Sequence, residues 1–193
     1  MSNVMNASAN NELTFIFGGA RSGKSRFAES FALSQASEKN LEPIYVATGE
    51  IRDEEMRQRI EHHQKSRDPR WQTLEEPLRL SELILRESTT ERVLLIDCLT
   101  LWLSNQQEQQ ANISTETLSL CQALQQAKGP IVLVSNEVGL GIVPANELAR
   151  HFRDEAGRLN QAIAAVCQNV YLVAAGLTLP LKTNNVPLGP EIP

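Results

Sequence analysis

Apolar and polar positions follow two distinct periods along the chain. Short runs rich in Val, Ile, Leu, Tyr and Phe predict buried strands at residues 13–17, 43–47, 92–97, 131–135 and 169–174. Between them, apolar residues recur with helical spacing, and the predicted helices span residues 26–31, 52–66, 78–88, 99–103, 114–128 and 145–167. Strands that alternate with helices in this way predict a mainly parallel sheet with helices on both faces.

Segments without either period predict tails and connections. Residues 1–12 are rich in Asn, Ser and Ala and predict a flexible N-terminal tail, whereas the Pro- and Asn-rich residues 183–193 predict a loose C-terminal tail. Residues 69–77 predict an irregular excursion, and the Gln-rich residues 106–112 predict a surface loop. Residues 13–182 are then expected to form a single α/β domain, which is long enough for a full-sized core.

The first predicted strand leads into a glycine-rich loop that matches the phosphate-binding pattern G-x-x-x-x-G-K-[ST], with a helix after it. We expect its glycines to take positive φ, so that successive N–H groups point at phosphate oxygens. Lys24 is expected to reach the β- and γ-phosphates, and the Ser25 hydroxyl to bind Mg²⁺. A glycine turn without a ligand is the alternative. The predicted phosphate-binding residues are Gly18, Gly19, Ala20, Arg21, Ser22, Gly23, Lys24 and Ser25.

Polar residues also follow the other predicted strands, at residues 48–50, at Asp97 and at residues 136–139. In parallel sheets of this kind, ligands bind beyond the carboxyl ends of the strands. The pattern therefore predicts one active site at this edge of the sheet. With the loop at residues 18–25, it predicts a P-loop NTPase fold of the RecA-like type.

Asp97 closes the most apolar of the predicted strands, where P-loop proteins place the acid that organises Mg²⁺. The alternative is that this carboxylate caps the following helix, and the two roles are compatible. Two further acidic residues lie at positions 75 and 76, and their role is less specific. Glu75 and Glu76 are candidates for a ribose or base contact, although two acids in a loop are usually just solvated.

Two adjacent histidines lie on the polar helix predicted at residues 52–66. His63 shares a helix face with Met56 and Ile60, which favours packing, whereas His62 shares its face with arginine and serine. Nearby cations keep an imidazole neutral more easily, and a neutral imidazole is a competent nucleophile at phosphorus. The alternative is that both histidines are simply solvated on a charged helix.

Near the end of the chain, residues 136–141 are expected either to line an acceptor pocket or to form a glycine turn. For the basic residues of the helix at 145–167, ion pairing with Asp154 and Glu155 is favoured over phosphate binding. These basic residues are Arg150, His151, Arg153 and Arg158.

Composition narrows the function further. The chain has 193 residues, 41% apolar and 21% charged, with a net charge of −5 and no basic block, so nucleic acid is a poor partner. Anionic substrates must be held locally, by Lys24, Arg21 and loop amides. No apolar stretch approaches the roughly 18 residues of a membrane span. The three cysteines lack metal-type spacing, which predicts reduced, mostly buried thiols and a cytoplasmic protein.

With these motifs in place, residues 13–182 resemble the bifunctional adenosylcobinamide kinase/adenosylcobinamide-phosphate guanylyltransferase family. The ordered combination is far more specific than the P-loop alone, and residues 1–12, 106–112 and 183–193 depart from the family outside its motifs. The resemblance rests on the runs Phe17-Gly-Gly-Ala-Arg-Ser-Gly-Lys-Ser-Arg26, Tyr45-Val-Ala-Thr48, Arg59-Ile-Glu-His-His63, Leu95-Ile-Asp-Cys-Leu-Thr-Leu-Trp-Leu103, Val134-Ser-Asn-Glu-Val-Gly-Leu-Gly-Ile-Val-Pro144, Ala149-Arg-His-Phe-Arg-Asp154 and Gly157-Arg-Leu-Asn160.

The resemblance implies that ATP or GTP phosphorylates adenosylcobinamide, and that GTP then guanylylates His62, which passes GMP to adenosylcobinamide phosphate. It also implies Mg²⁺, held by Ser25 and Asp97, and a homotrimer. A kinase without nucleotidyl transfer and a nucleotide-driven switch are the alternatives. Besides the P-loop, the implied GTP contacts are Ala47, Thr48, Gly49, His63, Gln64, Lys65, Ser66, Glu75 and Asp97.

Overall fold

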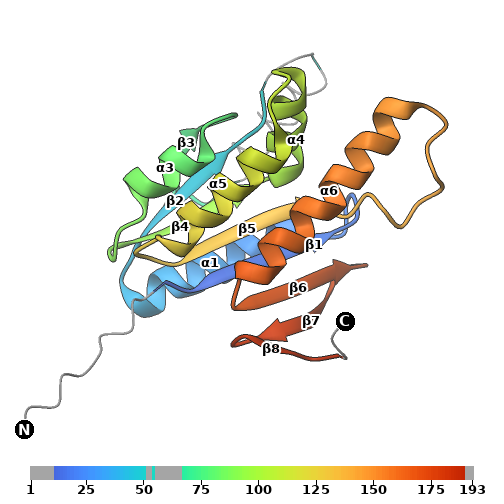
Figure 1. Ribbon diagram of the computed structural model, residues 1–193. Coiled ribbons are helices and arrows are strands. Elements are labelled where there is room, and N and C mark those ends of the chain that lie inside the picture. Colours follow the sequence, from blue (N-terminus) through green and yellow to red (C-terminus); the bar gives the residue numbers. More distant parts are fainter. Residues whose placement is uncertain (1–10, 51–53, 55–66, 190–193) are drawn as a thin grey trace, which may run out of the picture.

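The computed structural model describes residues 11–50, 54 and 67–189. In this part of the chain the strands form a single sheet with the order β3-β2-β4-β5-β1-β6-β7-β8 (Figure 1). The strands are β1 Leu13–Gly18, β2 Glu42–Ala47, β3 Gln72–Glu75, β4 Arg92–Asp97, β5 Ile131–Asn136, β6 Asn169–Ala174, β7 Leu177–Thr183 and β8 Val186–Pro187. The helices are α1 Lys24–Lys39, α3 Leu80–Glu87, α4 Leu99–Glu108, α5 Ile113–Gln125 and α6 Glu147–Val166.

Neighbouring strands from β3 to β6 in this order all pair in parallel, and only β7 and β8 are antiparallel. The predicted mainly parallel sheet is therefore confirmed. β1 lies between β5 and β6, and β4 lies between β2 and β5. The carboxyl ends of the parallel strands consequently meet at one edge of the sheet.

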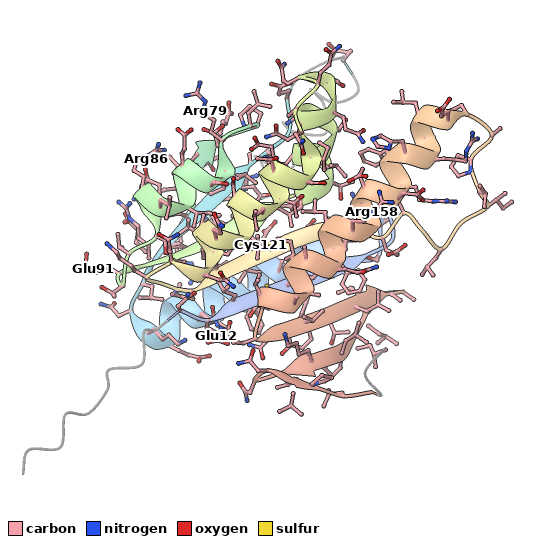
Figure 2. All side chains as sticks on the ribbon, viewed as in Figure 1. Glu12, Arg79, Arg86, Glu91, Cys121 and Arg158 are labelled. Carbon is pink, nitrogen blue, oxygen red and sulfur yellow. The ribbon has the colours of Figure 1, made fainter. Side chains whose placement is uncertain are left out.

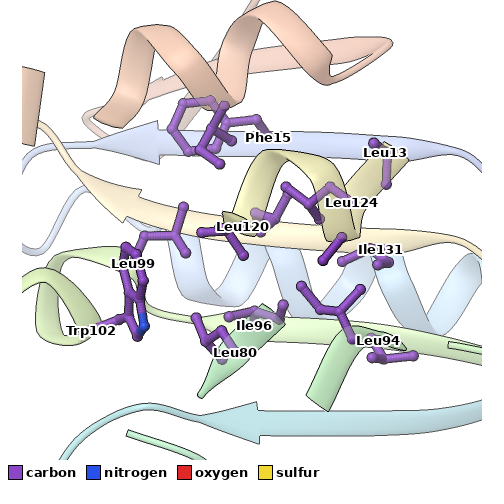
Figure 3. Close-up of a cluster of buried hydrophobic side chains, with 14 of the residues drawn as sticks. Leu13, Phe15, Leu80, Leu94, Ile96, Leu99, Trp102, Leu120, Leu124 and Ile131 are labelled. Carbon is purple, nitrogen blue, oxygen red and sulfur yellow. The ribbon is translucent and has the colours of Figure 1, made fainter. Parts of the chain in front are cut away.

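Side chains of successive strand residues point to opposite faces, so each face builds its own core. Helices α3, α4, α5 and α6 cover one face, which buries Phe15, Ile96 and Leu133 among others (Figures 1 and 3). Helix α1 packs its alanines against the other face, over Ile16 and Val134. The prediction of helices on both faces is confirmed.

Two predicted connections are regular structure. Residues 106–112 were expected to form a loop, but α4 continues to Glu108, and Gln106 is buried where its Nε2 donates to the Leu78 carbonyl oxygen at 2.7 Å. The irregular excursion at residues 69–77 contains β3, which pairs with β2 from Ile44↔Gln72 to Ala47↔Glu75. The polar residues in these segments suggested loops, but in the fold they bond to other parts of the chain: Gln106 to Leu78, and β3 to β2.

Both segments predicted as tails include described residues that belong to the fold. Glu12 accepts from Lys39 Nζ at 3.0 Å and from Asn169 Nδ2 at 3.1 Å, so the chain is already anchored there. At the other end, β8 continues the sheet through a tight turn at Asn184 and Asn185, which have φ of 49° and 67°. Asparagine tolerates positive φ, and two such residues in succession favour a hairpin. Within the described residues no helix is both long and apolar enough to cross a membrane.

Candidate active site

The phosphate-binding loop connects the end of β1 to the start of α1. Gly23, the N-cap of α1, has a φ of 97°, and Arg21 has a φ of 57°. Gly18 and Gly19 were also expected to need positive φ, and this was wrong. Gly18 is required for a different reason: a Cβ atom there would lie 2.2 Å from the carbonyl oxygen of Val173 on β6. Close packing of β1 against β6 therefore fixes where the loop begins.

Lys24 and Ser25 occupy the first turn of α1. The Lys24 side chain bends back over the loop, where Nζ donates to the Gly19 carbonyl oxygen at 3.2 Å. This places a positive charge beside the N-terminal end of the helix, where backbone N–H groups and the helix dipole also favour an anion. The loop can thus neutralise a triphosphate without a basic surface.

A turn from the far side of β6 supports the loop. The N–H of Gly176, in the tight turn between β6 and β7, donates to the Ser22 carbonyl oxygen at 2.9 Å. The Ser22 Oγ is buried and, within the described part of the chain, lacks a hydrogen-bond partner. A buried hydroxyl without a partner is costly, and a ligand oxygen at the loop would satisfy it.

The parallel strands β2, β3, β4 and β5 bring further predicted residues to the same edge. Ala47 is paired with Glu75 on one side and with Asp97 on the other, while Gly18 is paired with Asn136. Thr48 is fully buried just beyond β2, and its hydroxyl is used within the protein by Cys98. The predicted convergence of strand ends is present, but Thr48 acts there as a brace between strands.

Asp97 does not cap the following helix. Helix α4 has Cys98 as its N-cap, and the Asp97 Oδ2 instead accepts a hydrogen bond of 3.1 Å from the Tyr45 hydroxyl. Burial raises the pKa of the Cys98 thiol to about 12; the negative charge of Asp97 adds to this, and the positive charge of Lys24 opposes it. The charges of Asp97 and Lys24 thus both influence the Cys98 thiol, which lies just after β4.

The predicted Mg²⁺ ligands, Ser25 and Asp97, have side chains of a suitable chemical type for that ion. Their oxygens are the hard ligands that this ion prefers, and Mg²⁺ usually takes one or two protein ligands together with substrate phosphates and water. Among the described residues there is no cluster of three or more His, Cys, Asp or Glu that would form an all-protein metal cage. The donor set is thus compatible with Mg²⁺ that arrives with a nucleotide.

Several other polar residues have structural roles. Glu76, not Glu75, accepts from the N–H groups of Leu78 and Arg79 before α3, whereas Glu75 is exposed at the end of β3. Glu137 accepts from Gly139 and Leu140 N–H, which closes a local turn. Ion pairing was favoured on α6 and is confirmed for two pairs, Arg153 with Asp154 and Arg158 with Glu155. Arg158 is labelled on α6 in Figure 2. Arg150 instead donates to backbone carbonyls at residues 144 and 145.

Sequence reasoning missed a buried polar group at the end of β5. The Thr100 Oγ1 lies 3.3 Å from the Ser135 Oγ and accepts from the Asn136 N–H at 2.7 Å. Asn160 on α6 donates to the Asn136 carbonyl oxygen at 3.3 Å. The available signal was the placement of Thr100 and Asn160 among apolar neighbours on their helices. Together they hold the strand end that lies between the P-loop strand and Asp97.

The predicted nucleophile lies outside the described residues. This holds for the whole set of predictions on that segment, namely His62, His63, Gln64, Lys65 and Ser66. Their roles remain predictions.

Comparison with known proteins also covers the segment that contains His62 and His63. Residues 14–181 match the model of the family described as cobinamide kinase / cobinamide phosphate guanyltransferase. The chain belongs to this family.

Relatives in the same family support the assignment along nearly the whole chain. The bifunctional adenosylcobalamin biosynthesis protein CobP of Pseudomonas aeruginosa is 47% identical over 169 residues, which cover 86% of this chain and 95% of that protein. The bifunctional adenosylcobalamin biosynthesis protein CobU of Escherichia coli is 40% identical over 185 residues, covering 88% and 99% respectively. The family match spans the P-loop, both histidines and Asp97 in sequence.

Solved structures with the same fold are more distant in sequence. The flagellar accessory protein FlaH of Methanocaldococcus jannaschii has a TM-score of 0.53 at 14% identity and covers 93% of this chain and 81% of that chain. A second structure, described as an ATPase domain, has a TM-score of 0.54 at 13% identity, with 94% and 80% covered. The family fold is therefore of the RecA-like ATPase kind, as predicted.

Proposed function

We propose that this protein is a bifunctional enzyme that phosphorylates adenosylcobinamide and then transfers GMP from GTP to the product. The observation that carries the proposal is the family match over residues 14–181, which includes the P-loop and the histidine pair. Relatives named as bifunctional adenosylcobalamin biosynthesis proteins support both halves of the reaction. The product would be adenosylcobinamide-GDP, with pyrophosphate released.

In the kinase step, the acceptor hydroxyl oxygen attacks the γ-phosphorus of ATP or GTP. The bond from the γ-phosphorus to the bridging oxygen breaks, the hydroxyl loses its proton, and the nucleoside diphosphate leaves. Such transfers depend mainly on positioning and on neutralisation of phosphate charge. Lys24 and the loop N–H groups supply both from this chain. Mg²⁺, held through Ser25 and Asp97, would supply further charge neutralisation.

In the second step, an imidazole nitrogen of His62 attacks the α-phosphorus of GTP, and pyrophosphate leaves. The phosphate of adenosylcobinamide phosphate then attacks the same phosphorus, so that the nitrogen–phosphorus bond breaks and His62 is restored. A covalent intermediate replaces one difficult transfer by two easier ones. The P-loop suits this step because it already stabilises the leaving phosphates.

The test is labelling with GTP that carries ³²P at the α-phosphate. We expect the wild-type protein to retain label after denaturation, with the acid lability and alkali stability of a phosphoramidate. His62→Asn should abolish that label and leave most phosphorylation of cobinamide. His151→Asn, at an exposed position of α6, is the matched control and should label normally.

Three results would contradict the proposal or the role that it gives to His62. Absence of covalent label in an active kinase would reduce the protein to a kinase without nucleotidyl transfer. Nucleotide hydrolysis without either product would identify a nucleotide-driven switch. Loss of both activities in folded His62→Asn protein would give that histidine a structural role.

We also propose a homotrimer, which the family resemblance implies. Large apolar side chains exposed in the single chain support an assembly, with Leu140 and Ile142 87% and 97% exposed before α6 and Leu177 75% exposed on β7. Sedimentation velocity should give three times the mass of the chain. A monomer at micromolar concentration would contradict the assembly without affecting the chemistry.

A further inference from the structure

Tyr45 is a buried side chain on β2 that none of the assigned roles uses. It is 4% exposed and lies on the sheet face covered by α1. β2 and β4 pair in the register Tyr45↔Leu95 and Ala47↔Asp97. Tyr45 and its partner Leu95 point to the same face of the sheet. Residues two apart on a strand also share a face, so Asp97 lies on that face as well. The Tyr45 hydroxyl donates to the Asp97 Oδ2 at 3.1 Å across this diagonal.

The tyrosine ring is itself held in place on two sides. The Trp71 ring meets it edge-on, with centroids 5.8 Å apart and an interplanar angle of 82°. The Arg67 guanidinium carbon lies 3.5 Å from its centroid, and that guanidinium also donates to the Thr73 Oγ1 at 2.8 Å. Edge-to-face and cation–π contacts of this kind are directional. The direction of the Tyr45 hydroxyl is therefore set by the packing of β2, β3 and the residues before β3.

The hydroxyl remains a donor under ordinary conditions. In the hydrogen bond between Tyr45 and Asp97, the Tyr45 hydroxyl is the donor and the Asp97 Oδ2 is the acceptor. A protonated phenol that faces a carboxylate donates its single proton. Because a carboxylate is planar, fixing Oδ2 also restricts the direction of the second oxygen.

We infer that Tyr45 is a positioning residue for the nucleotide-bound metal, which orients the Asp97 carboxylate toward Mg²⁺. The inference rests on the proposed function, in which Asp97 and Ser25 hold that ion. Groups that orient a metal ligand typically change metal affinity by roughly 10–100-fold when they are removed. The role deepens the proposed chemistry, because an ordered carboxylate need not be reoriented when the metal arrives.

The test compares Tyr45→Phe with the wild-type protein in the binding of a GTP analogue with an imido group between the β- and γ-phosphates. Calorimetry is run in EDTA and then over a series of Mg²⁺ concentrations. Tyr45→Phe should need roughly tenfold more Mg²⁺ for half-maximal enhancement of binding. Its affinity in EDTA should stay within about twofold of wild type, because the phosphate-binding loop is unchanged. Thermal unfolding confirms that the variant is folded.

Tyr171→Phe is the matched control, since Tyr171 packs against Phe27 and Phe31 on the same sheet face and away from Asp97. It should give the wild-type Mg²⁺ dependence. An unchanged Mg²⁺ dependence in Tyr45→Phe would overturn the inference, as would equal weakening in EDTA and in Mg²⁺. So would binding by the wild-type protein that ignores Mg²⁺. Failure of the proposed function is distinct: it appears as Mg²⁺-dependent nucleotide binding without cobinamide phosphorylation or covalent GMP.

Discussion

The hydroxyl of Thr48 donates to the carbonyl oxygen of Cys98 at 2.7 Å and accepts from the N–H of the same residue at 2.8 Å. One side chain thereby satisfies both backbone groups of a buried residue that lies 50 positions away in sequence. The contact joins the ends of β2 and β4, where Ala47 is paired with Asp97. It therefore holds the backbone next to Asp97 in place at this edge of the sheet.

Thr48→Val should lower the free energy of unfolding by about 1–3 kcal/mol, because it leaves the Cys98 N–H unpaired in the interior, while the Cys98 carbonyl oxygen keeps only its bond from the Trp102 N–H. Thr48→Ser retains the hydroxyl and should cost much less. Urea denaturation of the three proteins measures the difference. Equal stability of the valine and serine variants would show that the hydrogen bonds contribute little.

Gly18→Ala should destabilise the protein by about 1–3 kcal/mol, because its Cβ must displace either β6 or the start of the loop. The required shift follows from the 2.2 Å separation between that Cβ and the Val173 carbonyl oxygen. Gly157→Ala on α6 is the opposite case. Its Cβ meets no atom within 4 Å, and alanine favours the helix by about 0.5–1 kcal/mol. Melting temperatures should therefore move in opposite directions, and a shift of the same sign in both would contradict the packing argument.

Lys24→Ala should suppress both cobinamide phosphorylation and covalent GMP formation, because in the proposed mechanism one loop binds the triphosphate in both steps. A loss of at least about 100-fold is expected for a group that stabilises phosphate charge during transfer. Lys39→Ala is the control at the other end of α1, where Lys39 pairs with Glu12 near the surface. Assays of both activities on the same preparations decide the matter. Retention of either activity in Lys24→Ala would separate the two nucleotide sites.

Alkylation should distinguish the cysteines of the folded protein. Burial raises the pKa of Cys167 to about 12, and Cys121 on α5 is only half-buried (Figure 2). Thiolate is the reactive form, so iodoacetamide at pH 8 should modify Cys121 long before Cys167, as read by mass spectrometry. Cys121→Ser should remove the faster reaction. Rapid modification of Cys167 would show that its helix end opens.

The same thiol gives the unfolding free energy a pH dependence. An unfolded Cys167 loses its proton near its ordinary pKa of 9.0, whereas the folded one keeps it to about pH 12. The unfolded state then binds fewer protons, so stability falls as pH rises through this window, by about 1.4 kcal/mol per pH unit at most. Cys98 has an equally raised pKa, so replacement of Cys167 by Ala should reduce the fall and leave the part that Cys98 contributes. Denaturation at a series of pH values from 8 to about 10.5 measures it.

The sequence pattern identified most of the strands and the helices between them, because a strand buried on both faces must be apolar throughout. It missed β3, with one apolar residue in four, and β7 and β8, which are exposed. Such strands are stabilised by pairing with a neighbour, and pairing leaves little trace in local composition. The Asn184-Asn185 turn was the readable signal for the final hairpin.

The sequence by itself determined the phosphate-binding loop and its family, because that loop needs particular residues at fixed spacing along a continuous segment. It also determined the strand ends that carry Asp97 and Thr48. Only the tertiary structure decided that Gly18 is needed for close packing, that Thr48 braces Cys98, and that Tyr45 holds Asp97. These are contacts between strands that are distant in sequence, and their geometry depends on strand order and register, which no local pattern encodes.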